Sequence, residues 1–186
     1  PIDIDMPFIE TARTNILLLA PEKAQLMLDY YSVNREHLSP WEPARSDSFY
    51  SLTHWQQQLS DNLEQFENGS ALKLVVLNKV TDEVIAICNF TNIVRGIFQA
   101  CNLGYSVSVK YQGQGYMLET LQAALTYVFN ELDLHRVMAN YMTSNQRSAV
   151  LLEQLEFKQE GLAKSYLKIA GRWQDHVLTA KINPAH

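Results

Sequence analysis

The sequence is poor in cysteine and in charge, and it lacks a long hydrophobic run. Its two cysteines, Cys88 and Cys101, stand in apolar or alternating segments. This predicts two buried, reduced thiols, with a nucleophilic thiol or a disulfide as the alternatives. No segment approaches the roughly 18 apolar residues of a membrane span, and the first residues show no signal-peptide pattern. These absences predict a cytoplasmic protein with no membrane partner.

Positive charge is also scarce. The chain has 15 Lys and Arg against 20 Asp and Glu, which gives a formal net charge of -5. A protein that binds nucleic acid directly carries a basic surface, so we expect no direct nucleic-acid binding. An acidic surface is instead compatible with a basic peptide partner. No His, Cys and carboxylate cluster has metal-ligand spacing, so we expect no metal.

What the sequence does contain is a pattern that fits one domain over residues 1–186, of which residues 1–10 are expected to form a tail. The periodicity predicts the order β-α-α-β-β-β-α-β-α-β-β, a mixed α/β sandwich around one mostly antiparallel sheet. The expected strands are 14–19, 71–77, 84–90, 100–109, 136–141, 158–169 and 173–182; the expected helices are 21–35, 53–67, 118–132 and 144–155, the last capped by Ser144.

A segment with two glycines joins an expected strand to the start of a long expected helix. Gly113 and Gly115 let the backbone approach a ligand closely, and a helix start offers unpaired N–H groups and a partial positive charge. Such a site favours a diphosphate. A Rossmann loop would need glycine where Leu118 stands, and a Walker loop would need Gly-Lys-Ser/Thr. A plain glycine turn is the alternative.

The segment from Gln112 to Met117 resembles the signature Gln/Arg-x-x-Gly-x-Gly/Ala of the GNAT N-acetyltransferases, with Met117 departing from its last position. The resemblance implies the GNAT fold, with strands splayed at the cofactor cleft, and acetyl-CoA as co-substrate. It also implies that the loop binds pyrophosphate, the preceding strand pairs with pantetheine and Asn145 contacts the cofactor arm. The residues expected to bind acetyl-CoA are Tyr105, Ser106, Val107, Gln112, Gly113, Gln114, Gly115, Tyr116, Met117, Asn145 and Ser148.

Within this family the sequence is most similar to the RimJ/RimL type. This resemblance implies acetylation of the N-terminal alanine of a small-subunit ribosomal protein, whose basic tail would be the partner, by a monomer or homodimer. At Leu155-Glu156-Phe157 such proteins usually have glycine in the middle, so we expect a relaxed turn here. The similar segments are residues 31–35, 38–43, 89–96, 103–106, 135–142 and 173–180.

Acetyl transfer needs a neutral amine, a polarised carbonyl and a proton for the leaving thiolate. Some ribosomal alanine acetyltransferases of this class use a Glu base and a Tyr acid, but Asn140 and Leu152 stand at those places here. Asn140 is therefore expected to orient a water and not to take a proton. An α-amino group, with a reference pKa near 8, needs a modest base or none.

Ser148 is the candidate acid. It follows Asn145 by three residues, so the two side chains share one face of the expected helix. In RimL-like relatives a serine here lies near the thioester sulfur, and the resemblance suggests the same role. The alternatives are a serine with only a local backbone hydrogen bond and an asparagine that merely caps the helix.

The acceptor is expected beside the loop Ser39–Pro43 and the last two strands. Glu42 stands between two prolines, where a carboxylate can receive an ammonium group, and Trp41 is expected to line the pocket. Asp175 and His176 are the other expected acceptor contacts, and both are base candidates with Glu42 and Glu160. A solvated acid, a core tryptophan and a structural histidine are the alternatives.

Three functions follow from these observations. The first is acetyl transfer from acetyl-CoA to the N-terminal alanine of a ribosomal protein. The second keeps the chemistry and changes the acceptor to a small amine, an aminoacyl conjugate or an antibiotic. The third is a non-catalytic ribosome-assembly or regulatory factor that keeps the fold; the absence of the Glu and Tyr pair favours it, and the intact glycine loop with Asn145 opposes it.

Overall fold

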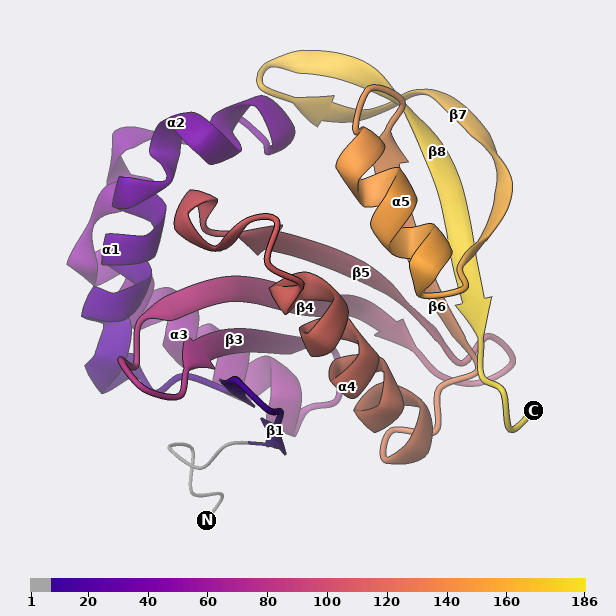
Figure 1. Ribbon diagram of the computed structural model, residues 1–186, viewed down its shortest axis with the longest axis horizontal. Helices are drawn as coiled ribbons and strands as arrows, with labels where there is room; N and C mark the ends of the chain where they lie inside the picture. The colour runs from indigo at the N-terminus through magenta and orange to yellow at the C-terminus, as the bar shows by residue number, and fades with distance from the viewer. Residues whose placement is uncertain (1–7) are drawn as a thin grey trace.

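The computed structural model describes residues 8–186, so most of the expected tail lies outside the described residues. One eight-stranded sheet forms the centre of the molecule, in the order β1-β2-β3-β4-β5-β6-β8-β7 (Figure 1). Neighbouring strands run antiparallel, except that β5 and β6 run parallel. The strands are β1 (Ile9–Glu10), β2 (Thr14–Leu17), β3 (Leu72–Asn78), β4 (Val84–Val94), β5 (Ala100–Val107), β6 (Arg136–Met142), β7 (Lys158–Ile169) and β8 (Arg172–Ile182).

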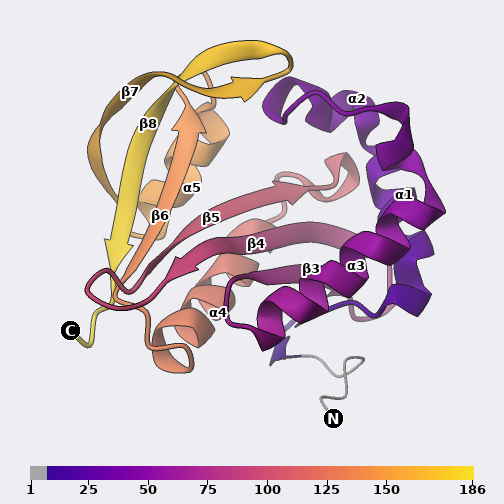
Figure 2. The same cartoon turned by 180° about the vertical axis from the view of Figure 1, so that it is seen from behind.

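Helices cover both faces of this sheet. Figure 1 shows α4 and α5 on one face, and Figure 2 shows α1 and α3 on the other. Within residues 8–186, no helix is long and apolar enough to cross a membrane. The α-helices are α1 (Ala24–Val33), α2 (Arg35–Leu38), α3 (Leu52–Glu67), α4 (Tyr116–Asn130) and α5 (Gln146–Gln154); the 3-10 turns are η1 (Pro21–Lys23), η2 (Ser39–Trp41), η3 (Asp47–Tyr50) and η4 (Val109–Tyr111).

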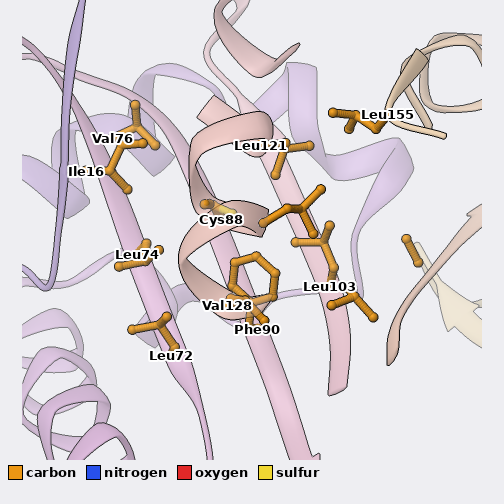
Figure 3. Close-up of a cluster of buried hydrophobic side chains, with 14 of the residues drawn as sticks. Ile16, Leu72, Leu74, Val76, Cys88, Phe90, Leu103, Leu121, Val128 and Leu155 are labelled. Atoms are coloured by element: carbon orange, nitrogen blue, oxygen red, sulfur yellow. The ribbon is translucent and has the colours of Figure 1, made fainter. Parts of the chain in front are cut away.

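Two apolar cores follow from this arrangement. The larger core lies between the sheet and the helices α4 and α5, and Figure 3 shows Val128 of α4 beside Phe90, with Leu121 farther along the same helix. The smaller core lies under α1 and α3. Cys88 and Cys101 are free, fully buried thiols, as predicted, and burial raises the pKa of Cys101 to about 12. Neither thiol is a ready nucleophile.

The sheet opens at its centre. Strands β5 and β6 pair from Ala100 with Arg136 to Leu103 with Ala139, and the pairing stops there. The strands then diverge, so that residues 104–107 and 140–142 leave a gap with unpaired backbone edges (Figures 1 and 2). The predicted α/β fold with splayed strands is therefore confirmed, and this gap positions the site.

Several element boundaries differ from the prediction. Ile9 and Glu10 form β1 and pair with β2, so the tail ends before them. The first helix is split, because Asn34 separates α1 from α2. The last helix is capped by Asn145 and not by Ser144, since Asn145 Oδ1 accepts a hydrogen bond from Ser148 N at 3.1 Å.

The turn after α5 was expected to be relaxed, and this expectation is wrong. Glu156 has φ +66°. This is the left-handed region, which is disfavoured for residues with a side chain and freely adopted by glycine. The backbone therefore keeps the conformation that suits glycine, although the residue has changed. Leu155 and Phe157 on either side are buried and hold the turn in place.

Candidate active site

A cavity of about 1020 Å³ lies where the sheet opens. This volume is of the order of large small-molecule sites. Its walls come from β5 and β6, from the glycine loop and the start of α4, from α5, from residues 37–42 and from the hairpin of β7 and β8. Segments from nearly the whole length of the chain therefore meet around one space.

The glycine loop has the conformation that its sequence requires. Gly113 and Gly115 have φ +71° and +80°, so both lie in the left-handed region. Gly115 is the N-cap of α4, which begins at Tyr116 rather than at the expected residue 118. The first N–H groups of a helix have no partner within it, and here they border the cavity. This arrangement fits an anionic group such as a diphosphate.

Arg13, which sequence reasoning missed, holds this loop from behind. Its Nη1 donates to the carbonyl oxygen of Gln114 at 3.0 Å, and its Nε contacts Glu119 Oε1 at 2.8 Å. The guanidinium also lies over the ring of Tyr116, 3.9 Å from its centre. Arg13 is about a hundred residues away in sequence and lies in no motif, so only the fold reveals the contact.

The open edge of β5 offers backbone groups to the cavity. Ser108 N donates to Ile85 O at 2.8 Å, and in an antiparallel pair such bonds recur at every second residue. The backbone of Ser106 therefore faces β4, whereas the N–H and C=O of Tyr105 and Val107 face the gap. Of the three residues expected to meet pantetheine, Tyr105 and Val107 have this orientation. His37 Nε2, also missed by sequence, lies 3.2 Å from Val107 O.

Side chains divide the cavity into two sides, because neighbours along a strand point to opposite faces. Tyr105 packs on the core beneath α4 and α5. Ser106 points the other way, and its Oγ lies 2.7 Å from the hydroxyl of Tyr30 on α1. On β6, Tyr141 packs on the α5 side, so Asn140 faces the α1 side. The gap in the sheet joins the two sides.

On the α5 side, three predicted residues come together. Tyr105 Oη donates to Ser148 Oγ at 2.9 Å, and Asn145 caps the helix through Ser148 N. All three line the cavity. The structure thus gives Asn145 its capping role and also a place at the cavity wall. The side-chain bond between Tyr105 and Ser148 joins positions 43 residues apart, and no sequence pattern indicated it.

On the α1 side, Glu42 lines the cavity with its side chain 19% exposed. Burial raises the pKa of this carboxyl, while Arg45, 3.7 Å away, opposes the shift. Its backbone oxygen accepts a bond from Ala170 N at 2.8 Å, so the loop meets the turn between β7 and β8. Trp41 also lines the cavity and is 42% exposed. This loop therefore forms one wall of the cavity.

Of the last two residues predicted to contact the acceptor, His176 lies at the cavity and Asp175 does not. His176 is buried and lines the cavity. Its Nδ1 lies 2.9 Å from Gln174 O; a carbonyl only accepts, so Nδ1 carries the hydrogen and Nε2 keeps a lone pair in the neutral ring. Asp175 instead accepts a bond from Ser165 N at 2.8 Å and shapes an irregularity in β7. The structure does not bring Asp175 into the cavity.

Two further candidates are also placed. Glu160, a base candidate, accepts a bond from Arg136 Nη1 at 2.6 Å and does not line the cavity. Leu152, at the place of the tyrosine acid in some relatives, is buried in the larger core. Within residues 8–186, no group of three or more His, Cys, Asp or Glu side chains could hold a metal ion.

A sheet that opens beside a glycine loop at a helix N-terminus defines the class of GNAT acyltransferases. The chain belongs to the GNAT acetyltransferase family, because its residues 15–158 match the family described as acetyltransferase (GNAT) domain. It is an N-acetyltransferase of this class, and its sequence is similar to enzymes of the ribosomal branch.

Three relatives illustrate this similarity. The [ribosomal protein uS5]-alanine N-acetyltransferase of Escherichia coli K12 is 44% identical, over 95% of this chain and 91% of its own. The structure of the ribosomal-protein-S5-alanine acetyltransferase of Vibrio fischeri superimposes with a TM-score of 0.91 at 38% identity, covering 94% of this chain and 96% of its own. RimJ of Mycobacterium smegmatis, in complex with CoA-disulfide, gives 0.85 at 26% identity, covering 91% and 81%.

Proposed function

We propose that this protein transfers the acetyl group of acetyl-CoA to the N-terminal alanine of a small-subunit ribosomal protein of the uS5 type, in the cytoplasm. One observation carries the proposal: the relative that acetylates alanine of uS5 is 44% identical along 95% of this chain. The acceptor is the α-amino group of a basic tail, which enters the side of the cavity that Glu42 and Trp41 border.

The residues present fit acetyl-CoA. The start of α4 offers N–H groups and the positive end of a helix dipole to the diphosphate. Tyr105 and Val107 offer strand-like backbone pairing to the pantetheine amides, and Asn145 lines the same path. Acetyl-CoA supplies an activated acyl group as a thioester. A carboxylate in the loop would oppose the diphosphate, and between Gln112 and Met117 the chain has none.

Glu42 is the proposed group for the incoming amine. A carboxylate at this wall attracts an ammonium group, and its raised pKa brings it closer to a base that works near neutral pH. Asn140 lines the α1 side of the cavity and orients a water between amine and base, since an amide takes no proton. On the other side, Ser148 gives a proton to the departing thiolate. Direct attack then needs no covalent enzyme intermediate.

A panel of acceptors tests this function against its rivals. The probes are a peptide with the N-terminal alanine and basic residues of the uS5 tail, the same peptide with its α-amine blocked, a lysine-free version and a polyamine. We expect the release of CoA with the free α-amine peptides alone. Preference for the polyamine would favour a small-amine enzyme, and no release with any amine, despite acetyl-CoA binding, would favour the non-catalytic factor.

A further inference from the structure

The side chain of Tyr105 makes a contact that its expected role as a backbone partner of pantetheine does not explain. Its hydroxyl donates to Ser148 Oγ at 2.9 Å, from a strand to a helix on the other wall of the cavity. We infer that Tyr105 is a positioning residue that fixes Ser148 as the proton donor to the leaving thiolate and replaces the proton that Ser148 gives up. This inference rests on the proposed acetyl transfer.

The hydrogens of this pair can be counted. A hydroxyl carries one hydrogen and two acceptor sites. Tyr105 donates its hydroxyl hydrogen to Ser148 Oγ. The backbone N–H of Ser148 donates to Asn145 Oδ1. Among the described residues, no oxygen or nitrogen accepts the hydroxyl hydrogen of Ser148. Both residues line the cavity, so this hydrogen is the one left for a ligand.

The step balances with this pair. As the bond from carbonyl carbon to sulfur breaks, sulfur keeps the electron pair and takes the proton of Ser148 Oγ. Ser148 Oγ in turn takes the proton of Tyr105 Oη. The amine nitrogen, which has formed the new bond to carbon, loses one proton to the base and solvent. Solvent then returns one proton to the phenolate of Tyr105, so that acetyl-CoA and amine give amide and thiol.

Acidity explains why a tyrosine suits this task. A thiol has a reference pKa near 8.5 and a phenol one near 10, so the phenol is a closer match for the thiolate than an aliphatic hydroxyl. Burial raises the pKa of Tyr105 to about 12, with the bond to Ser148 opposing the shift. The hydroxyl is therefore protonated at working pH. Tyr105 also packs on the larger core, and phenylalanine has the same ring, so packing alone does not require the hydroxyl.

The test is a double-mutant cycle of Tyr105→Phe and Ser148→Ala, with the release of CoA measured on whichever amine the unmodified protein acetylates. We expect Tyr105→Phe to lower kcat by about 10- to 100-fold, which is below most of the roughly 100- to 10,000-fold range of general acid–base catalysis, because Ser148 keeps its own proton in this variant. The KM for acetyl-CoA should stay within about twofold, because the backbone of β5 is unchanged. In the Ser148→Ala background, Tyr105→Phe should lower kcat almost no further, since the two side chains act as one unit.

Tyr127→Phe is the matched control. Tyr127 packs on the same core and does not line the cavity, so kcat should be unchanged. An unchanged kcat in Tyr105→Phe, or full additivity with Ser148→Ala, would overturn the inference. A larger KM with the same kcat would also overturn it, since that result assigns Tyr105 to binding alone. Because any accepted amine serves, a wrong ribosomal acceptor leaves this result readable.

Discussion

At the scale of single residues, the buried carboxyl of Glu42 lowers the stability of the fold at neutral pH and is also the proposed catalytic base. Its carboxyl is largely buried, and burial raises its pKa. A raised pKa in the folded state means that its contribution to stability is present below the unfolded value and is lost as the pH rises through the folded value. At neutral pH, Glu42 therefore lowers stability while it supplies a base.

This trade-off gives a prediction for Glu42→Gln. We expect kcat/KM at neutral pH to fall by about 100-fold, within the usual range for a lost general base, while the Tm at pH 7 stays equal or rises. In the unmodified protein, kcat/KM should fall as the pH drops through the raised pKa of Glu42, and the variant should lose this limb. Glu36→Gln, at an exposed position of α2, is the control; equal losses in both would contradict a base at Glu42.

The residues that sequence predicted share a local signal, and those that it missed do not. Gly113 and Gly115 sit between a strand and a helix, which is a local pattern, and Ser148 was selected by its spacing from Asn145 together with the resemblance to RimL-like relatives. Arg13 and His37 reach the site only because the fold brings distant segments together. Asp175 was misplaced because an alternating strand does not reveal that Ser165 N binds its carboxylate.

At the scale of elements, the glycine loop is the part of the site most exposed to substitution. In Gly115→Asp, a side chain must adopt φ +80°, and its Cβ would lie 3.6 Å from Nη2 of Arg13, so the substitution strains the loop and disturbs the arginine that holds it. We expect acetyl-CoA to bind on the order of 100-fold more weakly, about 2.7 kcal/mol, by titration calorimetry. Gly96→Asp is the matched control, because Gly96 has φ +69° and does not line the cavity. Equal binding in both variants would refute the phosphate site.

The turn after α5 gives a prediction about stability. Glu156 holds φ +66°, which costs a side-chain-bearing residue about 1–2 kcal/mol. Glu156→Gly should therefore raise the free energy of unfolding by up to about 1 kcal/mol, after the entropy of glycine in the unfolded chain is subtracted. Glu153→Gly, within the helix α5, should lower it by about 1 kcal/mol. Denaturant unfolding measures both, and a loss of stability in Glu156→Gly would contradict the strain.

Element types were predictable because long segments with a clear period have few alternatives. The residues at which these elements begin and end were less predictable. The expected cap Ser144 and the observed cap Asn145 are adjacent residues of the same capping class, and only the helix geometry decides between them. Strand β4 extends to Val94, beyond the expected residue 90, because the pairing partner Ala100 lies on β5 and is not visible locally.

At the scale of the whole molecule, the cavity joins segments from His37 to His176. A ligand that binds only the folded chain stabilises it by an amount that grows with the logarithm of the ligand concentration above its Kd. At 100 times its Kd, acetyl-CoA should add about 2.7 kcal/mol to the free energy of unfolding, or roughly 5–11 °C in Tm for a domain of this size. Thermal unfolding with and without acetyl-CoA checks this, and an unchanged Tm would argue against binding in the cleft.

The most direct test of the proposed function is mass spectrometry of small-subunit ribosomal proteins isolated without their native N-terminal acetylation and incubated with this protein and acetyl-CoA. We predict the gain of one acetyl group on the α-amine of one protein that begins with alanine, located by fragmentation, and no gain with the Gly115→Asp variant. Acetylation on lysine side chains, or none on any protein while acetyl-CoA binding is intact, would contradict the account.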